Sequence, residues 1–237
     1  MRVSVIIPCY NTARYLTEAL TSACRQTPAP WEVIVVDDGS TDDSAAVAEA
    51  FGAPVRCERR PHQGIGATRN HGLACATGDV VAFLDADDVW TDNSISARAT
   101  LLEQAPQLGG AGGRTEQFIS PELPDDVRQR LVCPPETSAA RVAGALLIRK
   151  RVFDLVGGFD PSLKLGETID WIARADAANV TMRLVDAVVL RRRIHDSNTG
   201  VNMAHQRSDY LRVLKASLDR KRAAGPSSGR SGGEGPS

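Results

Sequence analysis

The chain has 237 residues, and 28 lysines and arginines nearly balance 29 aspartates and glutamates, giving a formal net charge of −1. This balance excludes a polycation that binds nucleic acid along its whole length, and a hydrophobic content of 42% excludes a wholly disordered chain. The sequence contains no apolar run near the roughly 18 residues that span a bilayer. Its N-terminal apolar run is too short for a signal-peptide core, so we expect a cytoplasmic protein.

The five cysteines are odd in number and show no CxxC spacing. We therefore expect free thiols in a reducing compartment and neither a disulfide framework nor a zinc framework. His62, His71 and His205 likewise show no spacing that indicates a metal site.

The first third of the chain alternates short apolar runs with helical patterns. This alternation predicts right-handed βαβ units and a mostly parallel sheet flanked by helices. The predicted strands cover residues 3–7, 32–36, 55–58 and 80–84, and the predicted helices cover residues 12–25, 44–51 and 66–76.

The rest of the chain is less regular between residues 101 and 141. Beyond it we expect strands at 142–148 and 185–190 and helices at 150–156 and 167–178. We predict one domain over residues 1–202, a basic amphipathic helix over 203–222 and a disordered Gly/Ser/Pro tail over 223–237. The basic helix either docks on the domain through its leucine stripe, which we favour, or makes peripheral contact with an anionic membrane.

Two acidic clusters follow predicted strands. Asp37 and Asp38 come after the second strand, and residues 85–88 (DADD) come after the fourth. Because the carboxyl ends of parallel strands meet at one edge of a sheet, these carboxylates are expected to converge there. Such a concentration of negative charge predicts a bound cation.

Several short motifs follow one another along the chain. They are residues 3–11 (VSVIIPCYN), 36–42 (VDDGSTD), 67–72 (ATRNHG), 83–88 (FLDADD), 144–145 (GA), 157–160 (GGFD) and 193–195 (RIH). In this order they resemble family 2 glycosyltransferases of the GT-A fold. The resemblance covers roughly residues 1–198 and implies an α/β nucleotide-sugar-binding domain. It further implies an inverting transfer from a nucleotide-diphosphate sugar, with UDP-sugar as the expected donor and Mn²⁺ or Mg²⁺ as the cofactor.

The resemblance also implies roles for individual residues. Asp85, Ala86 and Asp87 match the DxD motif, in which Asp87 ligates the metal ion and Asp85 contacts ribose or a metal-bound water, with His195 completing the metal site. On the donor side, Asp38 would accept a hydrogen bond from the base and Arg69 would reach the phosphates. The remaining expected contacts are Pro8, Tyr10 and Asn11 around the base, and Gly144 and Trp171 on the acceptor side, where core packing is the alternative for Trp171.

The catalytic base is the point where this sequence departs from the family pattern. If Glu167 matches the glutamate of the usual Glu-Asp pair, Thr168 stands where the basic aspartate is expected. A threonine hydroxyl cannot act as a base near neutral pH, so Asp170 or Glu167 would replace it, with a slight preference for Asp170. A thiol acceptor, already partly ionised, would need less help from a base.

Two alternatives to a glycosyltransferase stay open: a non-catalytic nucleotide-sugar-binding protein or partner subunit, suggested by Thr168, and a nucleotidyltransferase. The second predicts a glycine-rich basic loop after the first strand, which residues 8–11 do not provide. The sequence does not identify the sugar, the oligomeric state or the acceptor. A polysaccharide, a lipid, a peptide or a small natural product would each be compatible, and no nucleic-acid partner is expected.

Overall fold

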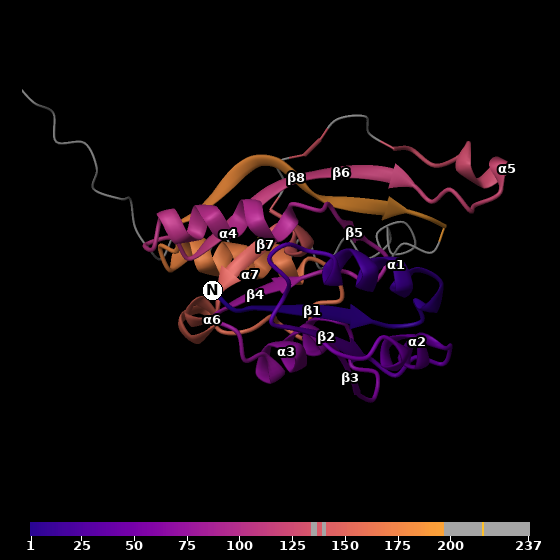
Figure 1. Cartoon of the computed structure of the whole chain (residues 1–237), viewed down its shortest axis with the longest axis horizontal. Coiled ribbons are helices and arrows are strands. Elements are labelled where there is room, and N and C mark those ends of the chain that lie inside the picture. Colours follow the sequence, from indigo (N-terminus) through magenta and orange to yellow (C-terminus); the bar gives the residue numbers. More distant parts are fainter. Residues whose placement is uncertain (134–136, 139–140, 197–214, 216–237) are drawn as a thin grey trace, which may run out of the picture.

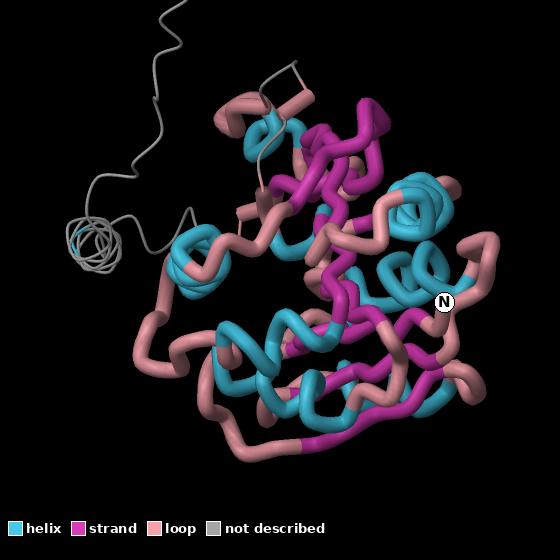
Figure 2. The backbone as a smooth tube through the Cα atoms, turned by 90° about the vertical axis from the view of Figure 1, so that its left-hand side faces the viewer, coloured by secondary structure: helices cyan, strands magenta, loops and turns pink. Residues whose placement is uncertain are grey.

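The computed structural model describes residues 1–133, 137–138, 141–196 and 215. An eight-stranded sheet runs through it in the order β3-β2-β1-β4-β7-β6-β8-β5, with helices on both faces (Figures 1 and 2). The α/β fold class predicted from the sequence is therefore confirmed. Apart from Lys215, the predicted basic helix over 203–222 and the tail over 223–237 lie outside the described residues.

The N-terminal half of the sheet is parallel, as predicted. β1 pairs in parallel with β2 and β4, and β2 pairs in parallel with β3. The predicted boundaries agree with the structure to within two residues. The elements are β1 (Val3–Cys9), α1 (Ala13–Cys24), β2 (Glu32–Asp37), α2 (Ser44–Ala50), β3 (Val55–Arg59), α3 (Ile65–Cys75) and β4 (Val80–Phe83).

The C-terminal half of the sheet is mixed. β7 pairs antiparallel with β4 and β6, β8 pairs parallel with β6, and β5 pairs antiparallel with β8. The predicted strand over 142–148 begins instead with a 3₁₀ turn, and the last strand is much longer than predicted. The elements are β5 (Val89–Trp90), α4 (Ser94–Gln104), β6 (Gly110–Ile119), α5 (Asp125–Arg128), η1 (Ala143–Ala145), β7 (Leu146–Arg149), α6 (Lys150–Val156), α7 (Glu167–Ala177) and β8 (Met182–Ile194).

The two faces of the sheet carry separate hydrophobic layers. Because side chains alternate along a strand, Val5 and Ile7 of β1 pack on one face with α1 and α4, and Ile6 packs on the other. The second layer includes an aromatic cluster in which Phe153 stacks on Trp171 with ring centroids 4.7 Å apart. This two-sided burial explains why β1 is apolar on both faces from Val5 to Cys9 and does not alternate with polar residues there.

The parallel pairing brings the ends of β1, β2 and β4 to the same edge of the sheet. The arrow of β1 in Figure 1 points towards this edge, where the chain turns back into α1. The loops after β2 and β4 carry both acidic clusters, so these clusters share the edge at which open α/β sheets bind ligands.

Helix α3 lies close against the sheet because Gly72 has no side chain. A Cβ at this position would lie well inside van der Waals contact with Cγ2 of the buried Ile6 and 3.2 Å from Cγ2 of Val36. We expect Gly72→Ala to lower the free energy of unfolding by about 1 to 3 kcal/mol, because overpacking outweighs the gain in helix propensity. Urea denaturation measures this change.

A double-mutant cycle with Ile6→Ala provides the control, because that change removes the methyl group that a Cβ at Gly72 would meet. In the Ile6→Ala background, Gly72→Ala is expected to cost little or nothing. An equal cost in both backgrounds would show that the close approach of helix and sheet is not the cause.

Candidate active site

The loop after β4 and the end of β8 meet at the carboxyl edge of the sheet. Oδ2 of Asp87 lies 3.0 Å from Nε2 of His195, although 108 positions separate the two residues in the chain. The His195 ring is buried and lies against Tyr15 of α1, with ring centroids 4.6 Å apart. The structure thus brings together two of the three residues predicted to bind a metal ion.

Asp88 and Arg193 hold this arrangement in place. The carboxylate of Asp88 accepts a 2.9 Å hydrogen bond from the backbone N–H of Arg193, and the Arg193 side chain donates to the backbone oxygen of Asp87. Burial raises the pKa of Asp88 well above its ordinary value, and the charges of Asp87 and Asp85 raise it further. Arg193 also pairs with Glu18 of α1, so it joins three elements beside the metal-ligand candidates.

Arg69 forms the buried centre of the site. Its guanidinium donates to Oδ1 of Asp85 at 2.7 Å and pairs with Glu167 at the start of α7. Burial alone would lower the pKa of Arg69, but the charges of Asp85 and Glu167 outweigh it and raise that pKa above its ordinary value. Arg69 thus joins the loop after β4 to α7, and its expected contact with the nucleotide or the phosphates stays a prediction.

The two candidate bases on α7 have different surroundings. Glu167 contacts Arg69 and the hydroxyl of Thr168, so it lies beside Asp85. Asp170 accepts a 2.8 Å hydrogen bond from Arg174, which also donates to the backbone oxygens of Val156 and Gly158. Asp170 thus helps to fasten α7 to the loop after α6, and the preference for it as the base stays a prediction.

The loop after β2 builds the predicted base-binding side of the site. Asp38 is buried, and its carboxylate accepts hydrogen bonds from the backbone N–H groups of Gln63 and Gly64 at 2.8 and 2.9 Å. Its Oδ2 also lies 2.9 Å from Nδ1 of His62. The ring of Tyr10, which is 46% exposed, stacks on His62 with centroids 4.2 Å apart. An accessible aromatic surface therefore stands beside Asp38.

Asn11 has a structural role in the same region. It adopts a left-handed backbone conformation with φ of 52°, and its side-chain oxygen accepts from the backbone N–H of Thr41 at 2.8 Å. Its own backbone N–H donates to Ser40. Asn11 thus ties the loop after β1 to the loop after β2.

Four predicted contacts lie in the interior of the protein. Trp171 is 1% exposed and donates its indole N–H to the backbone oxygen of Gly157, so the prediction that it stacks on the acceptor is wrong and the core alternative is right. Gly144 is buried against Leu190, and its carbonyl accepts from Trp90 rather than facing an acceptor. The side chains of Ala86 and Pro8 are also buried.

The residues at the edge of the sheet fit a divalent cation. Carboxylate oxygens of Asp85 and Asp87 are the hard ligands that Mg²⁺ and Mn²⁺ prefer, and the imidazole of His195 suits Mn²⁺ as well. The sequence missed Glu18, which has no signal of its own, and the pairing of His62 with Asp38. Arg193 was noted only as part of the RIH motif, without its contacts to Glu18 and to the loop after β4.

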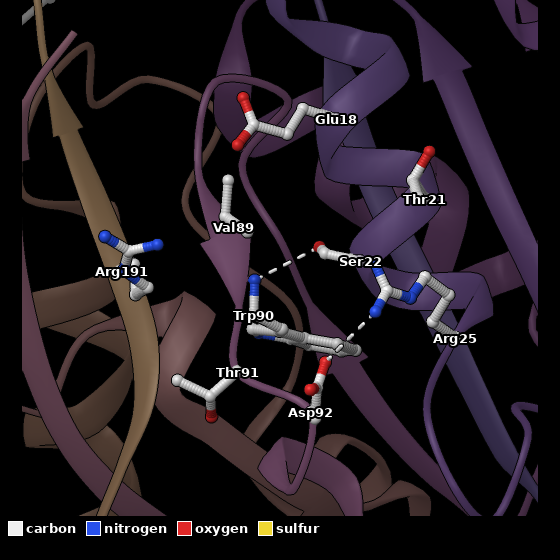
Figure 3. A pocket seen from close by; sticks show the side chains of 9 residues that line it. All are labelled: Glu18, Thr21, Ser22, Arg25, Val89, Trp90, Thr91, Asp92 and Arg191. Atoms are coloured by element: carbon white, nitrogen blue, oxygen red, sulfur yellow. Dashed lines mark hydrogen bonds and ion pairs between the residues drawn. The ribbon is translucent and has the colours of Figure 1, made fainter. Parts of the chain in front are cut away.

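A separate pocket of about 350 Å³ lies between α1 and β5 (Figure 3). Its walls are formed by Trp90 and by side chains of α1, and Arg25 and Asp92 face each other across it at 4.0 Å. None of the residues predicted to bind the donor or the metal ion is part of its lining. We therefore assign it no role in donor binding.

The fold and the site define this chain as a glycosyltransferase, and the comparisons with known proteins agree. Residues 4–151 match the profile of Glycosyl transferase family 2. An uncharacterised glycosyltransferase of Nostoc sp. is 30% identical over 92% of this chain and 73% of its own length. The chain belongs to glycosyl transferase family 2. A glycosyltransferase of Rickettsia typhi, also uncharacterised, is 27% identical over 88% of the chain and 69% of its own length.

Solved structures share the fold at lower sequence identity. S. aureus TarS residues 1–349 in complex with UDP superposes with a TM-score of 0.71 at 21% identity, covering 93% of this chain and 65% of that TarS fragment. The mannosyltransferase PcManGT of Pyrobaculum calidifontis, solved with GDP-Man and Mn²⁺, gives a TM-score of 0.66 at 19% identity, covering 92% of this chain and 64% of that enzyme. The chain thus spans just under two thirds of these structures.

Within its described residues, no helix combines the length and apolarity needed to cross a bilayer.

The ion pairs of Arg69 make a prediction about stability. We expect Arg69→Met to lower the free energy of unfolding by about 3 to 5 kcal/mol, because it leaves the buried Glu167 carboxylate without its positive partner. Arg141→Met removes a bidentate pair with Asp176 that is partly exposed, and it should cost less than about 1 kcal/mol.

Urea denaturation of both variants measures the difference. Adding Glu167→Gln to Arg69→Met is expected to restore part of the loss, because the unpaired charge disappears. Equal, small costs for Arg69→Met and Arg141→Met would contradict the central role of Arg69.

Proposed function

We propose that this chain transfers a sugar from a nucleotide-diphosphate sugar, with UDP-sugar as the donor, to an acceptor in a cation-dependent, inverting reaction. The observation that carries the proposal is the 3.0 Å contact between Asp87 and His195 at the carboxyl edge of the parallel strands, on the loop where Asp85 pairs with Arg69. The fold neighbours support it, since TarS was solved with UDP and with UDP-GlcNAc, and PcManGT with GDP-Man and Mn²⁺.

The donor's base would lie on the exposed aromatic surface of Tyr10 and His62. Asp38, which fixes His62 and the loop that follows it, would stand at the edge of the base and accept from its ring N–H. Ring stacking is worth about 1 to 3 kcal/mol per base in known complexes and is tolerant of base identity. The choice of base would therefore depend on hydrogen bonds at the position of Asp38.

Asp85, Asp87 and His195 would hold Mn²⁺ or Mg²⁺. When bound, the cation neutralises the charge that develops on the diphosphate as it leaves. Arg69 would add positive charge next to Asp85, and Arg193 would hold Asp87 and His195 in their relative positions. Electrostatic stabilisation of the leaving group would supply a large part of the rate enhancement.

Glu167 is the carboxylate best placed to accept the proton of the acceptor. An acceptor atom would attack the anomeric carbon from the face opposite the diphosphate, forming the new glycosidic bond. The bond from the anomeric carbon to the diphosphate oxygen would break in the same step, with its electron pair passing to that oxygen. Glu167 would take the acceptor's proton, because it lies beside Asp85 through their shared partner Arg69.

Removal of Asp87 tests the cation site. We expect Asp87→Ala to weaken Mn²⁺-dependent binding of UDP by at least tenfold and to abolish Mn²⁺-dependent hydrolysis of nucleotide sugars. Asp92→Ala is the matched control, because Asp92 follows on the same segment with its side chain 91% exposed. Calorimetric titration with UDP, with and without Mn²⁺, measures the effect. Binding that is independent of Mn²⁺ and unaffected by Asp87→Ala would refute the scheme.

Amide variants distinguish the roles of Glu167 and Asp170, the two candidate bases on α7. Glu167→Gln is expected to lower kcat by about 10²- to 10⁴-fold while donor binding is retained, as for loss of a general base. Asp170→Asn should mainly lower the melting temperature, because Asp170 holds Arg174. Steady-state kinetics and thermal melts of both variants provide the measurements. A kcat that falls only in Asp170→Asn would reverse the assignment.

A non-catalytic nucleotide-sugar-binding protein is the second candidate. The observation in its favour is that Arg69 contacts Asp85, Glu167 and Thr168 together, at the position where a free base is expected. This alternative predicts Mn²⁺-dependent UDP binding that is lost in Asp87→Ala, but no turnover of any donor with or without an acceptor.

A further inference from the structure

A second group of metal-ligating side chains lies away from the candidate active site. Glu58 of β3 and two residues of α3, His71 and Cys75, place one ligand atom each within 4.8 Å of one another. All three residues are half-buried. His71 and Cys75 are four positions apart, so they lie on the same side of the helix. From the sequence we expected no metal site at His71 and no zinc framework, but the fold brings Glu58 of the neighbouring strand to the same place.

The chemistry of the group favours Zn²⁺. Zinc binds thiolate sulfur at about 2.3 Å and imidazole nitrogen at about 2.0 to 2.1 Å, so neighbouring ligands in a tetrahedral site lie about 3.5 Å apart. Sγ of Cys75 lies 3.6 Å from Nε2 of His71, already at this spacing. Mg²⁺ prefers all-oxygen sites, and a cysteine ligand disfavours it. Three protein ligands leave the fourth position for water.

Arg56 organises the same group. Its guanidinium pairs with Oε1 of Glu58 and with Glu32, and it donates to the backbone oxygen of Cys75 at 2.9 Å. A carboxylate has two oxygens, so Glu58 can bind a metal ion through Oε2 while Arg56 holds Oε1. The C-terminal end of α3 favours a nearby cation.

We propose that Glu58, His71 and Cys75 form a zinc site that links β3 to the C-terminal end of α3. β3 is the terminal strand of the sheet, and it has a neighbouring strand only on one side. A metal ion bound there would fasten this strand to the helix that carries Arg69. The site is distinct from the donor-cation site in both position and ligand chemistry, and it does not depend on the proposed function.

Cobalt titration of the metal-free full chain tests the site. Co²⁺ takes the place of Zn²⁺, and a cysteine ligand gives a thiolate-to-cobalt charge-transfer band in the near ultraviolet. We expect this band in the wild type, its loss on adding Zn²⁺, and its absence in Cys75→Ser and His71→Gln. Cys133→Ser is the matched control and should keep the band, because Cys133 is not part of the group: its thiol donates to the backbone oxygen of Gln117.

The variant Asp87→Asn distinguishes the proposed zinc site from the donor-cation site. This variant should keep the cobalt band, because Asp87 belongs to the other site and supplies no sulfur. In thermal melts, Zn²⁺ at 100 times its Kd is expected to raise the Tm of the wild type and of Cys133→Ser by about 5 °C or more, and that of Cys75→Ser far less. Absence of the band in the folded wild type, or its persistence in Cys75→Ser, would overturn the proposal.

Discussion

The buried guanidinium of Arg69 determines how the two halves of the site meet. A buried cation is stabilised where carboxylates replace the lost hydration, and Arg69 has Asp85 on one side and Glu167 on the other. These residues come from α3, the loop after β4 and the start of α7. One electrostatic requirement therefore fixes three segments that are distant in the chain, and with them the position of the DxD loop relative to the candidate base.

Much of the fold could be predicted from local patterns, because the first half of the sheet consists of buried β-branched strands between amphipathic helices. β6 was indicated only as a short strand among the glycines of residues 109–113, and its full length of ten residues could not be predicted because those glycines weaken the strand signal. Gly112 and Gly113 leave room for Leu184 and Val189 of β8, side chains that come from about 70 residues away. Helix α4 was also missed: its fully buried face includes Arg98 and Ser94, which interrupt the apolar periodicity on which a helix prediction relies.

The same contrast between local patterns and tertiary packing holds for the site residues. The acidic loops could be predicted to converge, because strand direction alone brings them to one edge of the sheet. The partners of each side chain could not, because they depend on tertiary packing. Trp171 illustrates the limit: a tryptophan beside two acids looks accessible in the sequence, but Phe153 and Phe159 surround its ring in the core. His71 and Cys75 show the reverse case. Their four-residue spacing indicates a metal site only together with the carboxylate of Glu58, which the fold brings from the neighbouring strand.

The start of α7 shows why sequence alone could not choose between its acids. The positive end of the helix dipole favours a carboxylate at either position, so Glu167 and Asp170 are equally plausible in local terms. Their arginines distinguish them. Arg69 lies in the helix that faces the DxD loop, whereas Arg174 lies one turn further along α7 and reaches the backbone of Val156 and Gly158. Glu167 therefore lies against the arginine that contacts the loop after β4, and Asp170 lies against the arginine that holds the loop after α6.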